Sequence, residues 1–321
     1  MRAYATDRHG DIKDLSLRDD IAKPAPAPGE VLVKVKAAAV NPADLKVLMG
    51  RDGGGFLHAS KFPLILGFDF SGVVAEVGSE VKGRAVGDEV FGFLPYARST
   101  RGGTFAEYVA VAADTVGKKP KKISHEEAAA AATSTATALQ SLRDKGKLAA
   151  GQTVLINGAS GGVGSYAVQI AKAMGAKVIA TASAAKAEHV KSLGADRVVD
   201  YKSTPLSQLE ERFEVIFDVA ASSSYGVCGP LLKPSGTYVS LLPSPSLFLG
   251  MARALFSSKH CKMMVVQPVA SDFDQLAAWF DEGKLKPMVD TSYPLEEVPK
   301  ALERQRAGDV RGKIAITVDA S

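Results

Sequence analysis

Thr153-Val-Leu-Ile-Asn-Gly-Ala-Ser-Gly-Gly-Val-Gly-Ser165 carries the strongest structural signal in this chain, because a short apolar run ends there in a cluster of glycines. A helical pattern follows as far as Met174. Glycines permit a tight turn and a close approach to a pyrophosphate, and the helix N-terminus offers N–H groups and the positive end of its dipole to that anion. The order of strand, glycine loop and helix therefore predicts a dinucleotide-binding site.

Helices and strands alternate on both sides of this segment, from about residue 123 onward. A helix is expected from about Glu126 to Leu142, with Ser124 as its N-cap. Further helices are expected at 163–174 and 185–193, and strands at 153–157, 177–181, 197–199, 215–219, 237–241 and near 263–267. Strands that alternate with helices in this way predict an α/β fold with a doubly wound parallel sheet.

The first 120 residues have a different pattern, in which short strands are separated by glycine-rich turns. Strands are expected near 31–37, 72–77, 89–93 and 105–111, and such a series predicts a small barrel. The tail holds two expected helices, around 272–282 and 298–307, and a last strand at 313–318. We expect the tail to return to the first domain. Residues 1–122 and 270–321 would then form one domain, residues 123–269 the cofactor domain, and the cleft would lie between them.

Composition excludes several classes of protein. The 321 residues are 46% hydrophobic and 23% charged, with a net charge of +4, which is typical of a soluble globular protein without the basic stripe of a nucleic-acid binder. Two cysteines, Cys228 and Cys261, cannot form a disulfide framework or a four-cysteine zinc site. The sequence from Met1 lacks the apolar core of a signal peptide, and no apolar run reaches the roughly 18 residues of a membrane span. We expect a cytoplasmic protein that contacts neither nucleic acid nor membrane.

The end of the second strand, near Ser183, indicates which dinucleotide binds. An NAD site usually has Asp or Glu about 20 residues beyond the glycine loop, where it binds the ribose 2′-hydroxyl. Here no carboxylate occurs before Glu188, whereas Ser183 and Lys186 offer a hydroxyl and an ammonium to a 2′-phosphate. This arrangement favours NADP. In the alternative interpretation Ser183 caps the next helix and Lys186 is only solvated, and both can hold together.

Seven segments, taken in order, resemble the medium-chain dehydrogenase/reductase superfamily, and within it the zinc-independent quinone oxidoreductases and alkenal (enone) reductases. Each segment alone is modest support, but their joint occurrence in this order is specific and covers nearly the whole chain. They are Asn41-Pro-Ala-Asp-Leu-Lys46, Gly67-Phe-Asp-Phe-Ser-Gly-Val-Val-Ala-Glu-Val-Gly78, Gly87-Asp-Glu-Val90, Gly102-Gly-Thr-Phe-Ala-Glu-Tyr108, Gly158-Ala-Ser-Gly-Gly-Val-Gly164, Leu193-Gly-Ala-Asp-Arg-Val-Val-Asp-Tyr201 and Gly312-Lys-Ile314.

The resemblance implies a GroES-like β-barrel domain beside a Rossmann domain, and a homodimer. It also implies a set of residues that contact the cofactor: Thr137, Ser160, Gly161, Gly162, Val163 and Gly164 along the dinucleotide, with Ser183, Lys186 and Tyr201 around the 2′-phosphate. For Tyr201 the alternative is an aromatic side chain at a strand end that only packs against its neighbours.

Zinc-dependent members of the superfamily use a Cys, a Gly-His-Glu and a second Cys as ligands of the catalytic metal. Here 41–44 contains no thiol, and Gly67-Phe68-Asp69 has a phenylalanine, which cannot bind a metal, in place of the histidine. The segment 133–137 also lacks a cysteine, and the five histidines are scattered without ligand spacing. We therefore expect no catalytic zinc.

A reductase without a Lewis acid requires an acceptor that is already activated, such as a quinone or an α,β-unsaturated carbonyl. Hydride addition leaves negative charge on an oxygen, which hydrogen-bond donors stabilise. The candidates are the amide of Asn41 and the ammonium of Lys46, which could also relay a proton. Alternatively, Asn41 before proline only begins a turn and Lys46 is solvated. Lysine at position 46 is similar to the enone-reducing relatives, and Asp44 is expected to structure the turn.

Several alternatives stay open. The loop at 50–58 has four glycines in its first six residues and is expected to be mobile; it could act as a lid, with Tyr96 also bordering the substrate, or be an ordinary loop. A glycine loop alone cannot separate an NADPH-dependent enzyme from a zinc-free NADPH-binding redox sensor or structural protein with little turnover. A zinc alcohol dehydrogenase is a third possibility.

Overall fold

The computed structural model describes residues 1–51, 54–59, 61–100, 102–308 and 310–318. Packing divides the chain into two compact units. The first consists of Met1–Thr133, Gln267–Glu282 and Pro287–Ser321, and the second of Ser134–Val266 and Gly283–Lys286. The domain limits expected from the sequence stay a prediction.

A parallel sheet forms the centre of the second unit. Its strand order over the described residues is β11-β10-β9-β12-β13-β14, and every neighbouring pair is parallel. The strands are β9 (Thr153–Asn157), β10 (Lys177–Ala182), β11 (Arg197–Asp200), β12 (Phe213–Asp218), β13 (Leu232–Ser240) and β14 (His260–Met263). The reversal of strand order between β9 and β12 confirms the predicted doubly wound α/β sheet. Because all its strands are parallel, their carboxyl ends lie at one edge.

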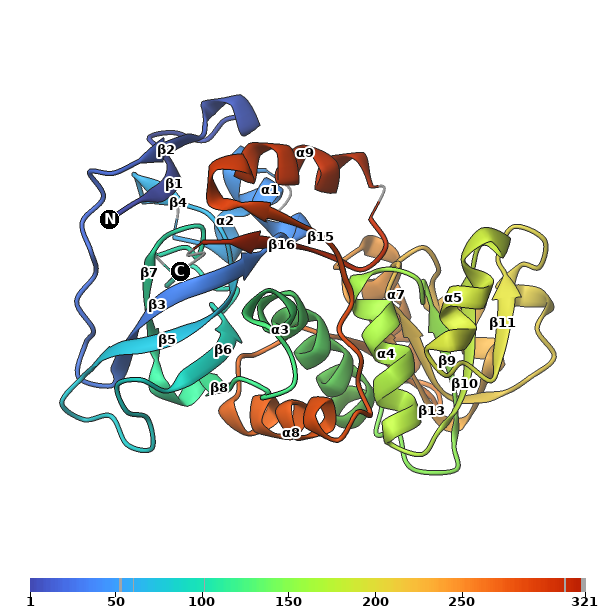
Figure 1. The fold of residues 1–321 in the computed structure, drawn as a ribbon. Helices are drawn as coiled ribbons and strands as arrows, with labels where there is room; N and C mark the ends of the chain where they lie inside the picture. The colour runs from blue at the N-terminus through green and yellow to red at the C-terminus, as the bar shows by residue number, and fades with distance from the viewer. Residues whose placement is uncertain (52–53, 60, 101, 309, 319–321) are drawn as a thin grey trace. The chain divides into compact units, whose positions relative to one another are not determined.

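Helices cover this sheet, so its central strand β9 is an apolar run rather than an alternating one. Val154, Leu155 and Ile156 in β9 are all fully buried, as expected for a strand covered on both faces. The helices of the unit are α4 (Gly162–Ala173), α5 (Ala187–Ser192), α6 (Tyr225–Cys228) and α7 (Pro245–Ala254). In Figure 1, α4 and α5 lie against β9, β10 and β11.

The helix α3 (His125–Gln140) begins in the first unit and ends in the second. The Ser124 hydroxyl accepts a hydrogen bond of 3.2 Å from the N–H of Glu127, and the Glu127 carboxylate accepts one of 2.8 Å from the N–H of Ser124. This reciprocal pair confirms Ser124 as the N-cap. After Gln140 the helix continues as a π-helical turn, Ser141–Lys145.

The first unit contains a seven-stranded sheet and a three-stranded sheet in the described part of the chain. The larger sheet has the order β15-β16-β3-β5-β6-β8, with β7 paired to β3, and the smaller has the order β2-β1-β4 (Figure 1). The strands are β1 (Ala3–Thr6), β2 (Ser16–Arg18), β3 (Glu30–Ala39), β4 (Leu64–Ile65), β5 (Asp69–Val77), β6 (Glu89–Phe93), β7 (Tyr108–Ala112), β8 (Val116–Lys118), β15 (Val289–Pro294) and β16 (Lys313–Thr317). The helices are α1 (Pro42–Met49), α2 (Gly54–Leu57), α8 (Ala270–Asp281) and α9 (Val298–Ala307).

Strands β16, β3 and β5 are neighbours in the larger sheet, and their register determines the position of the site below. Ala39, the last residue of β3, pairs with Asp69 in β5 on one side and with Ala315 in β16 on the other. The start of β5, the start of β16 and the chain leaving β3 toward α1 therefore meet at one end of the sheet.

Three elements differ from the sequence predictions. The strand expected near 263–267 is β14 at His260–Met263, because pairing with β13 fixes its position, whereas the apolar run that suggested it begins only at Met263. β15 was not expected, since its residues are largely polar. In the predicted loop at 50–58, residues 54–57 form α2, and residues 52–53 lie outside the described residues.

None of the described helices has the length and apolar character needed to cross a bilayer.

Candidate active site

The glycine loop of the second unit connects β9 to α4, as predicted. Gly158 has φ +90°, a conformation that favours glycine, and its N–H donates to Oγ1 of Thr181 at 3.1 Å. A Cβ at Gly164 would lie 2.1 Å from the carbonyl oxygen of Gly158, so any side chain there would clash with backbone. These two positions require glycine because the loop turns tightly onto the start of the helix.

The N-terminus of α4 is open on the side where an anion would bind. Gly161 is the N-cap and has no side-chain capping hydrogen bond, and the first turn holds no acidic residue. The N–H groups of Gly162, Val163 and Gly164 belong to the first turn, so no carbonyl within the helix accepts a hydrogen bond from them. A Cβ at Gly161 would meet only the Gly158 carbonyl oxygen, at 4.0 Å, and the adjacent Ser160 is half-buried. The loop therefore fits a dinucleotide pyrophosphate.

A buried network of hydrogen bonds at the ends of the strands supports the glycine loop. The carboxylate of Asp218, which is fully buried, accepts hydrogen bonds from Nδ2 of Asn157 at 2.8 Å, the hydroxyl of Tyr238 at 2.7 Å and the N–H of Ser223 at 3.0 Å. Thr181 donates to Oδ1 of Asn157 at 2.6 Å. Burial, together with the nearby Asp218, raises the pKa of Tyr238, so its hydroxyl remains a donor. Sequence reasoning missed this network, because its members come from four different strands or the loops after them.

The residues expected around a 2′-phosphate lie at adjacent strand ends. Ala182 in β10 pairs with Asp200 in β11, and the N–H of Tyr201 donates to the Ala182 carbonyl at 3.4 Å, so Ser183 and Tyr201 leave the sheet side by side. Ser183 stands at the N-cap of the short turn Ala184–Lys186, and its side chain makes no capping hydrogen bond there. Tyr201 is 53% exposed and Lys186 is half-buried at the start of α5. Thr137 is buried in α3.

In the first unit, Asn41 belongs to a buried polar cluster at the sheet end described above. It is the N-cap of α1 and forms a capping box with Asp44. Its Nδ2 donates to Oδ2 of Asp69 at 3.0 Å, and its Oδ1 accepts from Nζ of Lys313 at 2.5 Å. The same ammonium lies 3.1 Å from Oδ2 of Asp69. Asn41 and Lys313 are each 6% exposed and Asp69 is fully buried.

The other oxygen of Asp69 is bound from α3. Oδ1 accepts a hydrogen bond of 3.1 Å from the N–H of Thr133 and another from the Thr133 hydroxyl. The ring of Tyr96 lies 4.4 Å from the ring of Phe68, and burial, with Asp69 and Asp44 nearby, raises the pKa of the Tyr96 phenol. Tyr96 thus lies close to the cluster, and its hydroxyl stays protonated at neutral pH.

Asp44 structures the turn at Asn41, as expected. Its Oδ2 accepts the backbone N–H of Asn41 at 2.6 Å. Its Oδ1 is buried and has no hydrogen-bond partner among the residues that the structure describes. Burial, with a smaller contribution from the negative charge of Asp69, raises the pKa of Asp44 to about 7. A buried carboxyl of this kind is stabilised by holding its proton.

Among the described residues, no hydrogen bond joins the predicted pair Asn41 and Lys46. Lys46 lies on α1 and is half-buried, and no ion pair or side-chain hydrogen bond of its ammonium is found over the described ranges. The lysine that contacts Asn41 is Lys313. The signal for Lys313 and Asp69 was present in Gly312-Lys-Ile314 and Gly67-Phe-Asp69, but no local pattern shows that two charged residues so far apart share one buried site.

The cluster does not fit a catalytic zinc ion. Phe68 occupies the place of the family's histidine ligand and offers no donor, and the oxygens of Asp69 are already bound by Thr133, Asn41 and Lys313. The ammonium of Lys313 would also repel a cation. Within the residues that the structure describes, no group of three or more His, Cys, Asp or Glu residues has the arrangement of a metal site.

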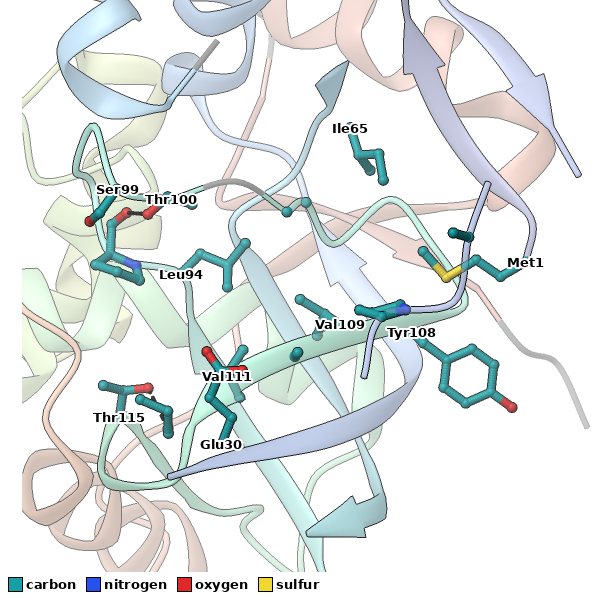
Figure 2. A pocket seen from close by; sticks show the side chains of 17 residues that line it. Met1, Glu30, Ile65, Leu94, Ser99, Thr100, Tyr108, Val109, Val111 and Thr115 are labelled. Carbon is teal, nitrogen blue, oxygen red and sulfur yellow. Dashed lines mark hydrogen bonds between the residues drawn. The ribbon is translucent and has the colours of Figure 1, made fainter. Parts of the chain in front are cut away.

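A separate cavity of about 580 Å³ lies in the first unit beside β7, and Figure 2 shows Met1, Leu94, Tyr108, Val109 and Val111 among the residues that line it. Its wall is largely apolar, with Glu30 as its one carboxylate. None of the predicted site residues lines it, so we assign it no chemistry.

Comparisons with known proteins agree with this geometry. A family model described as alcohol dehydrogenase GroES-like domain matches residues 27–121, which confirms the predicted GroES-like domain, and one described as zinc-binding dehydrogenase matches residues 193–316. The chain is 34% identical to the mitochondrial NAD(P)H oxidoreductase RTN4IP1 of Mus musculus, over 99% of this chain and 89% of that protein. It is 32% identical to a chloroplastic NADPH-dependent alkenal/one oxidoreductase of Arabidopsis thaliana, over 98% and 79%. A quinone oxidoreductase structure from Coxiella burnetii superposes with a TM-score of 0.87 at 32% identity and covers 99% of both chains.

Proposed function

Since this chain belongs to the medium-chain dehydrogenase/reductase superfamily, we propose that it is an NADPH-dependent reductase of quinones or α,β-unsaturated carbonyls. The proposal rests on the glycine loop of the second unit. Positions 158 and 164 of this loop can accept only glycine, and the N-terminus of α4 is open to an anion. Relatives named as NAD(P)H oxidoreductases support the same nicotinamide chemistry.

NADP is the proposed form of the cofactor. Ser183 and Tyr201 leave the sheet together, Lys186 follows three residues later, and the exposed Glu188 is the first carboxylate after β10. A hydroxyl, a phenol and an ammonium there would bind a 2′-phosphate, whereas the residue typical of NAD sites is a carboxylate. The relative named as NADPH-dependent agrees with this choice.

The acceptor is proposed to be reduced without a metal. NADPH, when bound, supplies a hydride from C4 of its nicotinamide. The chain then has to stabilise the negative charge that develops on the acceptor oxygen. We assign this to the Asn41 amide, which has one Nδ2 hydrogen left after its bond to Asp69. Lys46, whose ammonium is not engaged by the described residues, is proposed to supply the proton.

The test is a panel of acceptors offered with NADPH, including naphthoquinone, benzoquinone, acrolein and hexenal, while absorbance at 340 nm is followed. We expect acceptor-dependent loss of absorbance, with faster rates for the enones than for the quinones. Tight NADPH binding without turnover on any acceptor would contradict the proposal and favour a cofactor-binding sensor or structural protein.

A homodimer and a cytoplasmic location complete the proposal. Exposed apolar side chains support self-association: Phe248 on α7 is 55% exposed, and Leu255 and Phe256 just beyond it are 81% and 93% exposed. We expect light scattering to give twice the monomer mass, and Phe256→Glu to lower it. The relatives named above carry organelle names, so fractionation of the native cells is the test of location.

A further inference from the structure

We propose that Asp69 and Lys313 are positioning residues, which fix the Asn41 amide in one of its two possible orientations and so make it a donor toward the acceptor. The inference rests on the proposed function, because it concerns the group assigned there to the acceptor oxygen. It adds two residues from β5 and β16 to the machinery of the reaction.

The chemistry of the three side chains determines the orientation. An ammonium can only donate hydrogen bonds and an ionised carboxylate can only accept them. Lys313 therefore requires the Asn41 oxygen, which it meets at 2.5 Å, and Asp69 requires the Asn41 nitrogen, which it meets at 3.0 Å. The flipped amide would face an N–H toward the ammonium and an oxygen toward the carboxylate. Two favourable contacts would thus become two repulsive ones.

The cluster is also fixed in position. Asp69 and Lys313 are the first residues of β5 and β16, and Asn41 follows β3, the strand that lies between them in the sheet. The second Asp69 oxygen is bound by Thr133, so the carboxylate cannot rotate without losing those bonds. With all three side chains buried, water does not offer Asn41 alternative partners.

Stability alone does not account for the pair. Replacing a buried ion pair by apolar residues of similar size is often neutral or stabilising. The two charged groups of the cluster bind the oxygen and the nitrogen of a single amide, that of Asn41. As a result, one Asn41 N–H, and not the carbonyl oxygen, stays available to the acceptor. An amide free to flip would present its oxygen to the acceptor oxygen for part of the time, and that contact is repulsive.

The test is a double-mutant cycle on turnover. Lys313→Met, Asp69→Asn and the paired variant Asp69→Asn/Lys313→Met are made with Asn41 present and in the Asn41→Ala background, and kcat is measured at saturating NADPH and enone. A positioning role predicts a loss of about 10- to 100-fold with Asn41 present and less than about threefold in the Asn41→Ala background. Lys313→Arg, which keeps a donor, should recover much of the rate. Lys300→Met, which removes an exposed ion pair with Glu297, is the matched control.

The outcomes separate this inference from the proposed function. If Asn41→Ala is slow but the pair variants turn over normally, or if they lose the same factor in both backgrounds, the positioning role is wrong and the proposed function stands. If Asn41→Ala keeps full turnover, the donor assignment fails and the inference fails with it. Should the single variants not fold, the paired variant, which removes both charges together, supports the same comparison.

A spectroscopic measurement tests the orientation without turnover. The chain has two asparagines, Asn41 and Asn157, so protein labelled with ¹⁵N-asparagine gives two pairs of side-chain amide signals, and Asn41→Ala identifies one pair. We expect the Asn41 hydrogens to exchange slowly with solvent in the native protein and at least tenfold faster in Lys313→Met, which adds no asparagine, while Asn157 is unchanged. Unchanged exchange at Asn41 would overturn the inference.

Discussion

The Nζ atom of Lys313 lies 3.1 Å from Oδ2 of Asp69, and this ion pair joins residues 244 positions apart in the chain. Both side chains are almost fully buried, so each charge depends on the other. Breaking such a pair by removing one partner typically costs about 3–5 kcal/mol, because the remaining charge is left unpaired. The polar groups around Asn41 are therefore held by the fold of the first unit itself.

Replacing Asn41 by alanine should slow the chemical step and leave the cofactor bound. Loss of one donor to a developing oxyanion costs roughly 100- to 1,000-fold in turnover, and we expect that range for Asn41→Ala with an enone under single-turnover conditions. The dissociation constant of NADPH, measured by fluorescence, is the control and should change less than about threefold. An unchanged single-turnover rate would remove Asn41 from the mechanism.

Replacing Lys186 by glutamate should weaken NADPH far more than NADH. The variant puts a carboxylate where a 2′-phosphate is expected, so we predict at least a tenfold rise in the NADPH dissociation constant and little change for NADH. The matched control is Lys191→Glu, on the short helix α5 that Lys186 precedes as N-cap, where Lys191 pairs with Glu188 at 2.9 Å. Equal losses for both cofactors would reject the phosphate contact.

Local signals in the sequence were sufficient to predict much of the structure of the second unit. Ser124 and Glu127 form their cap within four residues, and β9 with its glycine loop is specified by consecutive residues, so both were predictable. β14 was placed too late because its limits follow from pairing Thr237 with His260 and Ser240 with Met263, and its own residues are less apolar than those that follow.

The first-unit cluster could be predicted only in part. Asn41 was a candidate because its amide can donate a hydrogen bond and its segment resembles that of the family, but its partners come from two other strands. The alternation of polar and apolar residues along β5 and β16 does not indicate that Asp69 or Lys313 is buried, because charged residues at strand starts are commonly solvated. Their burial is a tertiary property, which the register of β3 with both strands produces.

Two alanine substitutions in the glycine loop should separate folding from cofactor binding. A methyl at Gly164 would lie 2.1 Å from the Gly158 carbonyl, so Gly164→Ala should lower the melting temperature of the cofactor-free protein. At Gly161 the backbone suits any residue and the added methyl meets only one atom, at 4.0 Å. Gly161→Ala should keep its melting temperature yet bind NADPH at least tenfold more weakly, since the methyl occupies the side open to the pyrophosphate. Retained affinity would place the pyrophosphate elsewhere.

Chelators should leave turnover unchanged. The place of the family's histidine ligand is held by Phe68, and Lys313 carries positive charge into the cluster. We expect enzyme dialysed against EDTA to keep its kcat within about 20%, and mass spectrometry of the purified protein to show no stoichiometric zinc. A rate that falls on dialysis and returns with added zinc would contradict the metal-free mechanism.

The pKa of Asp44 makes a signed prediction about stability and pH. An unperturbed aspartate has a pKa of 3.8, and burial raises the pKa of Asp44 to about 7 in the folded protein. Between these values the folded state holds a proton that the unfolded state has lost, so the contribution of Asp44 to stability is full below pH 3.8 and is lost as pH rises toward 7. The size is on the order of a few kcal/mol.

Other carboxylates oppose this trend, because hydrogen bonds hold the pKa of Asp11 and Asp14 below the usual value. The measurement is therefore the difference in unfolding free energy between the native protein and Asp44→Asn, obtained by urea denaturation at half-unit steps from pH 4 to pH 8. Because asparagine does not titrate, the native protein should lose stability relative to Asp44→Asn as the pH rises through this window. A difference that is constant with pH would show that Asp44 is ionised throughout, and would require a partner for its second oxygen.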